Sequence, residues 1–236
     1  MSLIQIQGHS IESRFLNQTS TVLDLGANHG AFSQQMVERF RCRVIAVEAN
    51  SSLADKIQRL GSFEVVNACV GGGDGMVELA IAENDQCSSM LMPQTSAILR
   101  REIVPMRSLP GLLAQFQVKR VDLLKMDIEG AEVQVLDAIP DIEFQRVAQL
   151  TVEFHDSLGM TSLEEIRRIT HRLEALGFVW IRGSFWNFED NLFLNRALCP
   201  MTDLEVWFSR NVMRTWNGVS RIARRRWSAF RARLAN

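Results

Sequence analysis

Five apolar stretches of this chain end in a polar residue. Each stretch has the length and composition of a buried strand. The polar residues are Asp24, Glu48, Asn67, Asp127 and Glu153. Carboxylates can accept hydrogen bonds from ligand hydroxyls, attract a cation, or take up a proton during a reaction. Lys125 and His155 lie two positions from Asp127 and Glu153, so each pair shares one face of its strand. The sequence therefore predicts a charged rim with acid–base capacity.

The segment 21–32, TVLDLGANHGAF, predicts how one part of this rim approaches a ligand. Its first five residues suit a strand buried on both faces, and Gly26 and Gly30 let the backbone come close to a ligand. The spacing D-x-G-x-N-x-G differs from the G-x-G-x-x-G of dinucleotide sites, where a helix N-terminus faces a pyrophosphate. Asp24 would repel that anion and would suit a cationic ligand. S-adenosylmethionine, a nucleoside with a sulfonium and an ammonium group, has this chemistry.

The elements that must position these residues alternate between strand and helix. Buried strands are expected at 21–25, 44–48, 63–70, 120–126 and 146–154, an exposed strand at 76–81, a short strand at 103–106, and late strands at 178–181 and 191–195. Helices are expected at 29–40, 51–60, 112–116, 130–139 and 162–176. This pattern is typical of an α/β fold with a doubly wound, mostly parallel sheet covered by helices on both faces. Ligands then bind at the carboxyl ends of the strands, where the five polar residues would meet.

Composition excludes several classes of protein. The chain has 236 residues, of which 47% are hydrophobic and 22% are charged, and this is enough for one sizeable core. No apolar run reaches the ~18 residues of a membrane span, and the first residues lack the basic start and apolar core of a signal peptide. The four cysteines form no C-x-x-C pair, so neither a zinc site nor a disulfide framework is expected. A cytoplasmic location is the expectation.

Charge divides the chain into two parts. Residues 206–236 hold eight arginines and no acid, whereas residues 1–205 carry 18 basic and 27 acidic groups. We expect a catalytic domain over 1–205 and a basic amphipathic helical tail over 206–236. Basic amphipathic helices with Trp rest on anionic membranes, here as a peripheral contact at the inner face of a membrane. The alternative is that the apolar stripe docks on the domain or on a second subunit of a homodimer. Nucleic-acid binding is not expected, because the acidic body would oppose it.

The chain resembles the FkbM-type family of class I methyltransferases, which use S-adenosylmethionine and have a Rossmann-like fold. The family's D-x-G-A-N-x-G-x-F opening stands at 24–32, its acid at the end of the second strand is Glu48, its K-x-D-x-E-G-x-E element stands at 125–132, and its E-x-H stands at 153–155. The resemblance covers about residues 20–195. One departure is Ser108-Leu109-Pro110, where relatives usually have T-L-D.

The resemblance implies S-adenosyl-L-methionine as cofactor. The residues expected to bind it are Asp24, Gly26, Ala27, Asn28, Gly30, Phe32, Glu48, Ala49, Asn67, Ala68 and Asp127. Glu48 would accept hydrogen bonds from both ribose hydroxyls, or instead cap a helix. Asp24 and the turn after it would border the methionine part, with Asn28 in a positive-φ conformation that Asn tolerates. Asn67 and Ala68 would lie near the adenine, although Asn67 is also a suitable strand-end turn residue.

The implied reaction is methyl transfer to an oxygen, expected to be a hydroxyl of a sugar, a glycan or a small secondary metabolite. The expected catalytic residues are His155, Asp127, Glu153, Lys125 and Glu129. His155 is favoured as the base because its unperturbed pKa is near neutral, and Lys125 would hold a carboxylate or lower a neighbouring pKa. Structural roles for His155 and Glu129 remain open, as do nitrogen methylation and a catalytically silent adaptor acting through the tail. No metal is expected; the alternative is Mg²⁺ held by Asp127, Glu129, Glu153 and His155.

Overall fold

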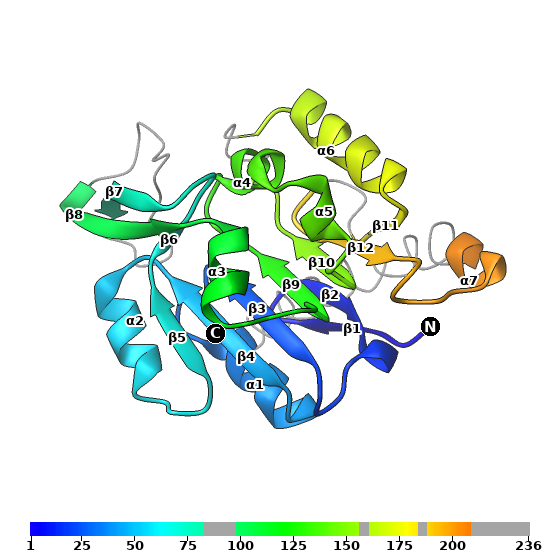
Figure 1. Cartoon of the computed structure of the whole chain (residues 1–236), viewed down its shortest axis with the longest axis horizontal. Helices are drawn as coiled ribbons and strands as arrows, with labels where there is room; N and C mark the ends of the chain where they lie inside the picture. The colour runs from blue at the N-terminus through cyan, green and yellow to red at the C-terminus, as the bar shows by residue number, and fades with distance from the viewer. Residues whose placement is uncertain (83–97, 156–160, 184–187, 209–236) are drawn as a thin grey trace, which may run out of the picture.

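The computed structural model describes residues 1–82, 98–155, 161–183 and 188–208. Its central sheet has seven strands in the order β11-β12-β10-β9-β3-β4-β5. Their bounds are β3 Thr21–Leu25, β4 Arg43–Glu48, β5 Glu64–Asn67, β9 Leu123–Met126, β10 Gln149–Val152, β11 Phe178–Arg182 and β12 Asn191–Asn195. Among the strands of this described sheet, β12 alone runs against the others. The mostly parallel α/β sheet is therefore as predicted (Figure 1).

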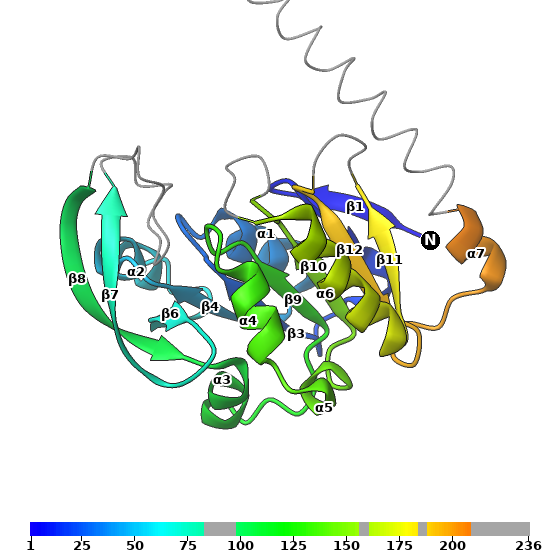
Figure 2. The ribbon, with the colours of Figure 1, turned by 90° about the horizontal axis from the view of Figure 1, so that it is seen from above.

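Helices cover both faces of the sheet, as Figure 2 shows for α1 and α4. The helices are α1 Ala31–Phe40, α2 Ser51–Gln58, α3 Leu109–Gln115, α4 Glu132–Ala138, α5 Asp141–Phe144, α6 Leu163–Ala175 and α7 Asp203–Phe208. Alternate strand residues point to opposite faces: Val22 packs with Phe32 and Met36 of α1, whereas Leu23 packs with Leu136 and Ile169 on the α4 and α6 side. The central strands are thus buried on both faces, which explains their continuous apolar sequence.

The expected third strand, 63–70, is divided between two sheets. β5 ends at Asn67, and β6, Cys69–Val70, pairs with β8, Ile98–Arg107, in a separate three-stranded sheet that also contains β7, Gly75–Ala82. The chain turns at Ala68, whose N–H donates to the Glu48 carbonyl oxygen at 3.1 Å. The prediction of one continuous strand was wrong because periodicity cannot detect a change of partner within an apolar run.

A hairpin near the N-terminus was not predicted. β1, Leu3–Ile6, and β2, His9–Glu12, are joined by Gln7 and Gly8, both of which have positive φ. A two-residue loop of this kind matches the twist of a hairpin. Alternating apolar residues on either side of a Gln-Gly pair are the sequence signal that could have revealed it.

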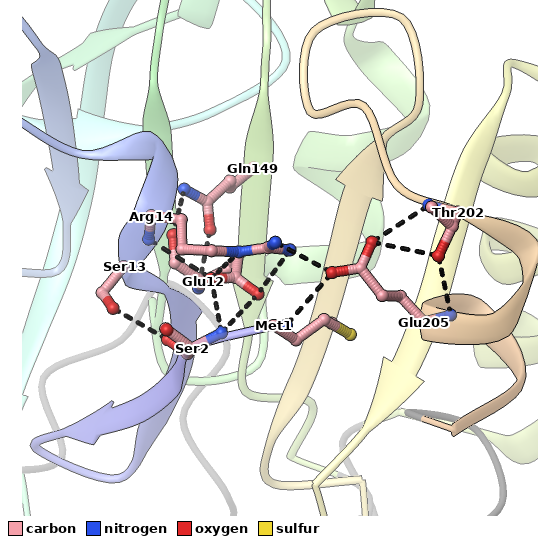
Figure 3. A network of polar contacts seen from close by, with 8 residues as sticks. All are labelled: Met1, Ser2, Glu12, Ser13, Arg14, Gln149, Thr202 and Glu205. Atoms are coloured by element: carbon pink, nitrogen blue, oxygen red, sulfur yellow. Dashed lines mark hydrogen bonds and ion pairs between the residues drawn. The ribbon is translucent and has the colours of Figure 1, made fainter.

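Polar contacts hold this hairpin against β10 and against α7 (Figure 3). Gln149 of β10 and Glu12 form a reciprocal pair: the Glu12 N–H donates to Gln149 Oε1 at 2.9 Å, and Gln149 Nε2 donates to the Glu12 carbonyl at 3.1 Å. Asp190 accepts both the N–H and the hydroxyl of Ser10. Arg14 links the buried Glu12 to Glu205 of α7. The position of His9, at the start of β2, is therefore fixed from several elements.

Candidate active site

The register of the sheet brings four of the five polar residues to one edge. Glu48 pairs with Asn67 across β4 and β5, and Leu25 pairs with both Val47 and Met126, so Asp127 follows β9 just where Gly26 follows β3. Val152 pairs with Met126, which places Glu153 beside Asp127. Four of the five polar residues therefore lie at the carboxyl edge as predicted, whereas Asp24 lies within β3, one residue before its end.

The turn after β3 requires its glycine. Gly26 has φ +81°, and a Cβ at this position would lie 1.8 Å from the carbonyl oxygen of Asp127. Asn28 has φ +50°, which confirms the conformation expected of it. Gly30, with φ +76°, begins α1 and lies against Ile57 and Phe63. Gly26 thus lets two strand-end loops touch, while Gly30 serves the packing of α1 against α2.

Glu48 is buried at the end of β4 and holds the neighbouring loops. Its Oε2 accepts the Asn28 N–H at 2.7 Å, and its Oε1 accepts the Asn50 N–H at 2.8 Å. Burial raises the pKa of Glu48, while the two backbone hydrogen bonds and the charge of Lys125 oppose that rise. Each carboxylate oxygen has a further lone pair. The carboxylate is fixed in place and can still accept ribose hydroxyls.

Asn67, Ala49 and Ala68 form the next part of the rim. Asn67 Nδ2 donates to the carbonyl oxygens of Glu48 and Ala49, both at 3.0 Å. Ala68 is buried, while Asn67 is exposed. The Asn67 side chain thus shapes the loop after β4, and its Oδ1 is the group that could face an adenine.

Asp24 and Lys125 form a buried ion pair beneath the turn. Lys125 Nζ lies 3.1 Å from Asp24 Oδ1, 3.6 Å from Asp127 Oδ2 and 2.6 Å from the Gly26 carbonyl oxygen, to which it donates. Asp24 also accepts the Ser33 hydroxyl at 2.6 Å. Although burial opposes the charge of Lys125, these carboxylates raise its pKa. Both residues support the loop from below; Asp24, being fully buried, does not reach a ligand directly.

A cavity of about 210 Å³ opens above this pair. Predicted residues that line it are Gly26, Ala27, Asn28, Phe32, Lys125 and Asp127, and the hairpin adds Gln7 and His9. His9 is only 1% exposed, its ring meets Phe32 edge to face, and its Nε2 lies 3.7 Å from Asp127 Oδ2. His9 was missed by sequence reasoning because it lies outside every motif, and only the hairpin signal pointed to its segment.

Asp127 stands between two histidines. Besides His9, it contacts His155, whose Nε2 lies 3.7 Å from Asp127 Oδ1 and 3.5 Å from Glu129 Oε2. Burial would raise the pKa of Asp127, but the charge of Lys125 and the two imidazoles hold it well below its usual range. Lys125 therefore does hold a carboxylate and lower its pKa, as predicted. Asp127 stays ionised at neutral pH and is a poor proton acceptor.

His155 and Glu132 form an ion pair. His155 Nδ1 lies 3.0 Å from Glu132 Oε1, which also accepts the backbone N–H groups of Ile128 and Gly130. Burial lowers the pKa of His155, but Glu132, Glu129 and Asp127 outweigh it and raise the pKa to about 9. The imidazole is thus protonated at neutral pH. Its role as the base stays a prediction, and this charge argues against it.

Two carboxylates have pKa values near neutral pH, so each can accept a proton there. Burial raises the pKa of Glu129 to about 7, and the charges of Asp127 and Glu132 add to this effect. Burial and the charge of Asp127 likewise raise the pKa of Glu153 to about 7. Glu129 also has φ +55°, a left-handed conformation that is unusual for a residue of its size. The acid–base capacity of the rim therefore lies in these carboxylates as well as in His155.

Two groups of side chains within the described residues have the spacing of metal ligands. They are His9, Asp127 and Glu153, and Asp127, Glu132 and His155; within each group the ligand atoms lie within 4.8 Å of one another. Neither group matches the metal site suggested from the sequence, which was Asp127, Glu129, Glu153 and His155. The first group includes His9 and the second includes Glu132, and neither residue belongs to that set.

The expected boundary at residue 205 falls inside α7, and most of the tail lies outside the described residues. α7 exposes Leu204, Trp207 and Phe208. Among the helices that can be described, none is long and apolar enough to span a bilayer.

Sheet order and strand-end site together define a class I methyltransferase with a Rossmann-like fold. The family comparison makes this specific: the Methyltransferase FkbM domain matches residues 24–179, more than half of the chain. The chain belongs to this family.

Relatives with curated names are distant. The chain is 23% identical over 188 residues to the methyltransferase sdnD of Sordaria araneosa, covering 64% of this chain and 73% of that one. It is 24% identical over 211 residues to the AMB antimetabolite synthetase AmbE of Pseudomonas aeruginosa, covering 72% of this chain but only 10% of that protein. Among solved structures, a TehB-like SAM-dependent methyltransferase from Corynebacterium glutamicum is similar at 8% identity, with a TM-score of 0.43 and coverage of 78% and 84%.

Proposed function

We propose that this protein transfers a methyl group from S-adenosyl-L-methionine to an oxygen atom, a hydroxyl of a sugar, a glycan or a small secondary metabolite. The observation that carries the proposal is the glycine-lined cavity at the carboxyl edge, with an acid fixed on either side of it. Glu48 stands at the end of β4 and Asp127 after β9, and the turn from Gly26 to Asn28 lies between them.

The residues present fit this cofactor. The cavity above Phe32 and Lys125 has backbone and side-chain groups for the methionine part, and the fixed Glu48 carboxylate retains lone pairs for two ribose hydroxyls. Asn28 Oδ1 is buried with no hydrogen-bond partner among the described residues, so it can accept one from the ligand. When bound, the cofactor supplies an activated methyl group, and the protein mainly aligns donor and acceptor.

The acceptor needs a group to take its proton. Glu129 and Glu153, which share a cluster with Asp127 and His155, supply proton acceptors beside the cavity, because burial raises the pKa of each to about 7. This supports an oxygen acceptor over an amine, which needs no strong base. A silent adaptor would have no use for this cluster. The particular hydroxyl compound is a matter for a substrate screen.

Calorimetry tests the cofactor assignment. The folded protein should bind S-adenosylmethionine and its demethylated product, and Glu48→Ala should weaken both by roughly 10-fold or more, since a carboxylate with two ribose hydroxyls contributes more than about 1.4 kcal/mol. Glu38→Ala, an exposed acid of α1, is the control. No heat with either compound from folded protein would refute the proposal.

We also propose that residues 206–236 contact anionic membranes. Their eight arginines and the exposed apolar residues of α7, which overlaps the start of this segment, support this idea. In liposome flotation, the full chain should rise with anionic but not with neutral vesicles, because the arginines need negative lipid. Removal of 206–236 should abolish flotation. Equal recovery in the soluble fraction with both vesicle types would end the membrane proposal and leave docking on the domain or a second subunit.

A further inference from the structure

His9, Asp127 and Glu153 come from three separate elements and converge beside the cavity. They stand on β2, after β9 and after β10. Their ligand atoms, an imidazole nitrogen and two carboxylate oxygens, all lie within 4.8 Å of one another. Ligands of a bound divalent ion stand about 3 to 4 Å apart, given bonds of about 2.1 Å, so small side-chain movements would bring these atoms to an ion.

His9 is buried with one ring nitrogen unpartnered. Its side chain is 2% exposed, its Nδ1 has no partner in the described structure, and its Nε2 stands 3.7 Å from Asp127 Oδ2. That distance is longer than an ordinary hydrogen bond, whereas a buried imidazole normally donates one hydrogen bond and accepts another. The hairpin contacts of Ser10 and Glu12 hold it here. His9 is therefore aimed at Asp127 with its hydrogen-bonding capacity largely unused.

The cluster also carries excess negative charge. Four carboxylates surround it, those of Asp127, Glu129, Glu132 and Glu153. Two cations lie near them, the protonated His155 and Lys125, and Lys125 is shared with Asp24 and the Gly26 carbonyl oxygen, so the carboxylates still outnumber the cations. Within the described residues the Glu153 carboxylate has no hydrogen bond or ion pair, although one of its oxygens lies within 4.8 Å of an Asp127 oxygen. A divalent cation would neutralise part of this charge and give His9 Nε2 and the Glu153 carboxylate a direct partner.

We propose that His9, Asp127 and Glu153 bind a divalent metal ion beside the cofactor cavity. One imidazole with two carboxylates suits Mn²⁺ or another first-row ion better than Mg²⁺, which prefers oxygen alone. This proposal departs from the expectation of no metal, and the set differs from the alternative named from the sequence by including His9 and omitting Glu129 and His155. A hydroxyl bound to such an ion would lose its proton more readily, which fits the proposed reaction, but ion binding does not depend on that reaction.

Titration with Mn²⁺ tests the site without any turnover. The full chain, freed of metal with a chelator, should remove the free Mn²⁺ signal in electron paramagnetic resonance at one ion per chain. Glu153→Gln and His9→Gln should each weaken binding at least 10-fold, since each removes a ligand. His171→Gln and Glu164→Gln, both exposed on α6, are the matched controls and should bind like the wild type.

A second measurement needs no variant, in case His9→Gln does not fold. The chain has four histidines. In the wild-type protein, substoichiometric Mn²⁺ should broaden the imidazole NMR signals of His9 and His155 while His171 stays sharp. The proposed site would be refuted if Mn²⁺ stayed free at millimolar protein and metal. It would also be refuted if Glu153→Gln left Mn²⁺ binding unchanged. Calorimetry with S-adenosylmethionine on the same samples tells this failure apart from a failure of the cofactor assignment.

Discussion

At the scale of single residues, the two family motifs are joined by one close backbone contact. Gly26, in the first motif, lies so near the carbonyl oxygen of Asp127, in the second, that no side chain fits between them. Lys125 adds a hydrogen bond to the Gly26 carbonyl oxygen from the same side. The sequence motifs indicated both elements, but their mutual contact follows from the register of β3 and β9, which a single sequence does not encode locally.

Replacing Gly26 should damage both stability and cofactor binding. Gly26→Ala places a Cβ 1.8 Å from a backbone oxygen at φ +81°. We therefore expect a loss of more than about 2 kcal/mol of stability and no measurable cofactor affinity. Gly61→Ala is the control, because Gly61 has φ +67° but open space around its Cβ, and it should lose about 1 kcal/mol. Urea unfolding and calorimetry measure both; equal losses in the two variants would contradict the steric explanation.

Lys125 should act as a structural cation. Lys125→Met leaves Asp24 fully buried without its cation, and breaking one partner of a buried pair costs about 3 to 5 kcal/mol. Lys119 is exposed. Lys119→Met should therefore change the free energy of unfolding by no more than about 0.5 kcal/mol. If urea melts show the two variants to be equally stable, Lys125 does not support the loop in this way.

At the scale of elements, regular amphipathic patterns were predicted well. β12 was expected at its observed bounds, and α6 within a residue or so, because Ser162 begins a capping box with Glu165. The hairpin β1–β2, the division of the third strand and the residue His9 were not predicted. Each depends on contacts between distant segments, such as Glu12 with Gln149. The cofactor half of the candidate site was therefore accessible from motifs, and the hairpin side was not.

Replacing Gln149 should lower the stability of the protein more than its position in a strand suggests. Gln149→Met keeps the volume but leaves the buried N–H and carbonyl of Glu12 unpaired, so we expect a loss of about 2 to 4 kcal/mol. Gln58→Met, on the exposed side of α2, is the control. Hydrogen exchange should show faster opening of β1 and β2 in the first variant alone. Unchanged protection there would mean that the reciprocal amide pair does not hold the hairpin.

At the scale of the whole molecule, three buried cysteines report on separate parts of the core. Cys42, Cys69 and Cys199 belong to three different apolar clusters. Burial raises the pKa of Cys42 to about 11 and those of Cys69 and Cys199 to about 12. Their thiols are therefore neutral and inaccessible in the folded protein.

Thiol labelling should follow global unfolding. With iodoacetamide under mildly alkaline conditions, Cys42, Cys69 and Cys199 should react slowly and at similar rates in the native protein, because thiolate forms only after opening. In urea all three should react rapidly, as read by mass spectrometry of the digested protein. Fast native labelling of one of the three would show that its cluster opens independently of the rest.

The hairpin's hydrogen bonds to residues far along the chain affect how the protein folds during its synthesis. Glu12 and Gln149 are 137 positions apart, and Ser10 and Asp190 are 180 apart. On a ribosome the hairpin must wait until almost the entire sheet has been translated before its partners exist. Contacts of such separation slow folding, since a long loop must close first. His9 can therefore reach its final place only in the last steps of assembly.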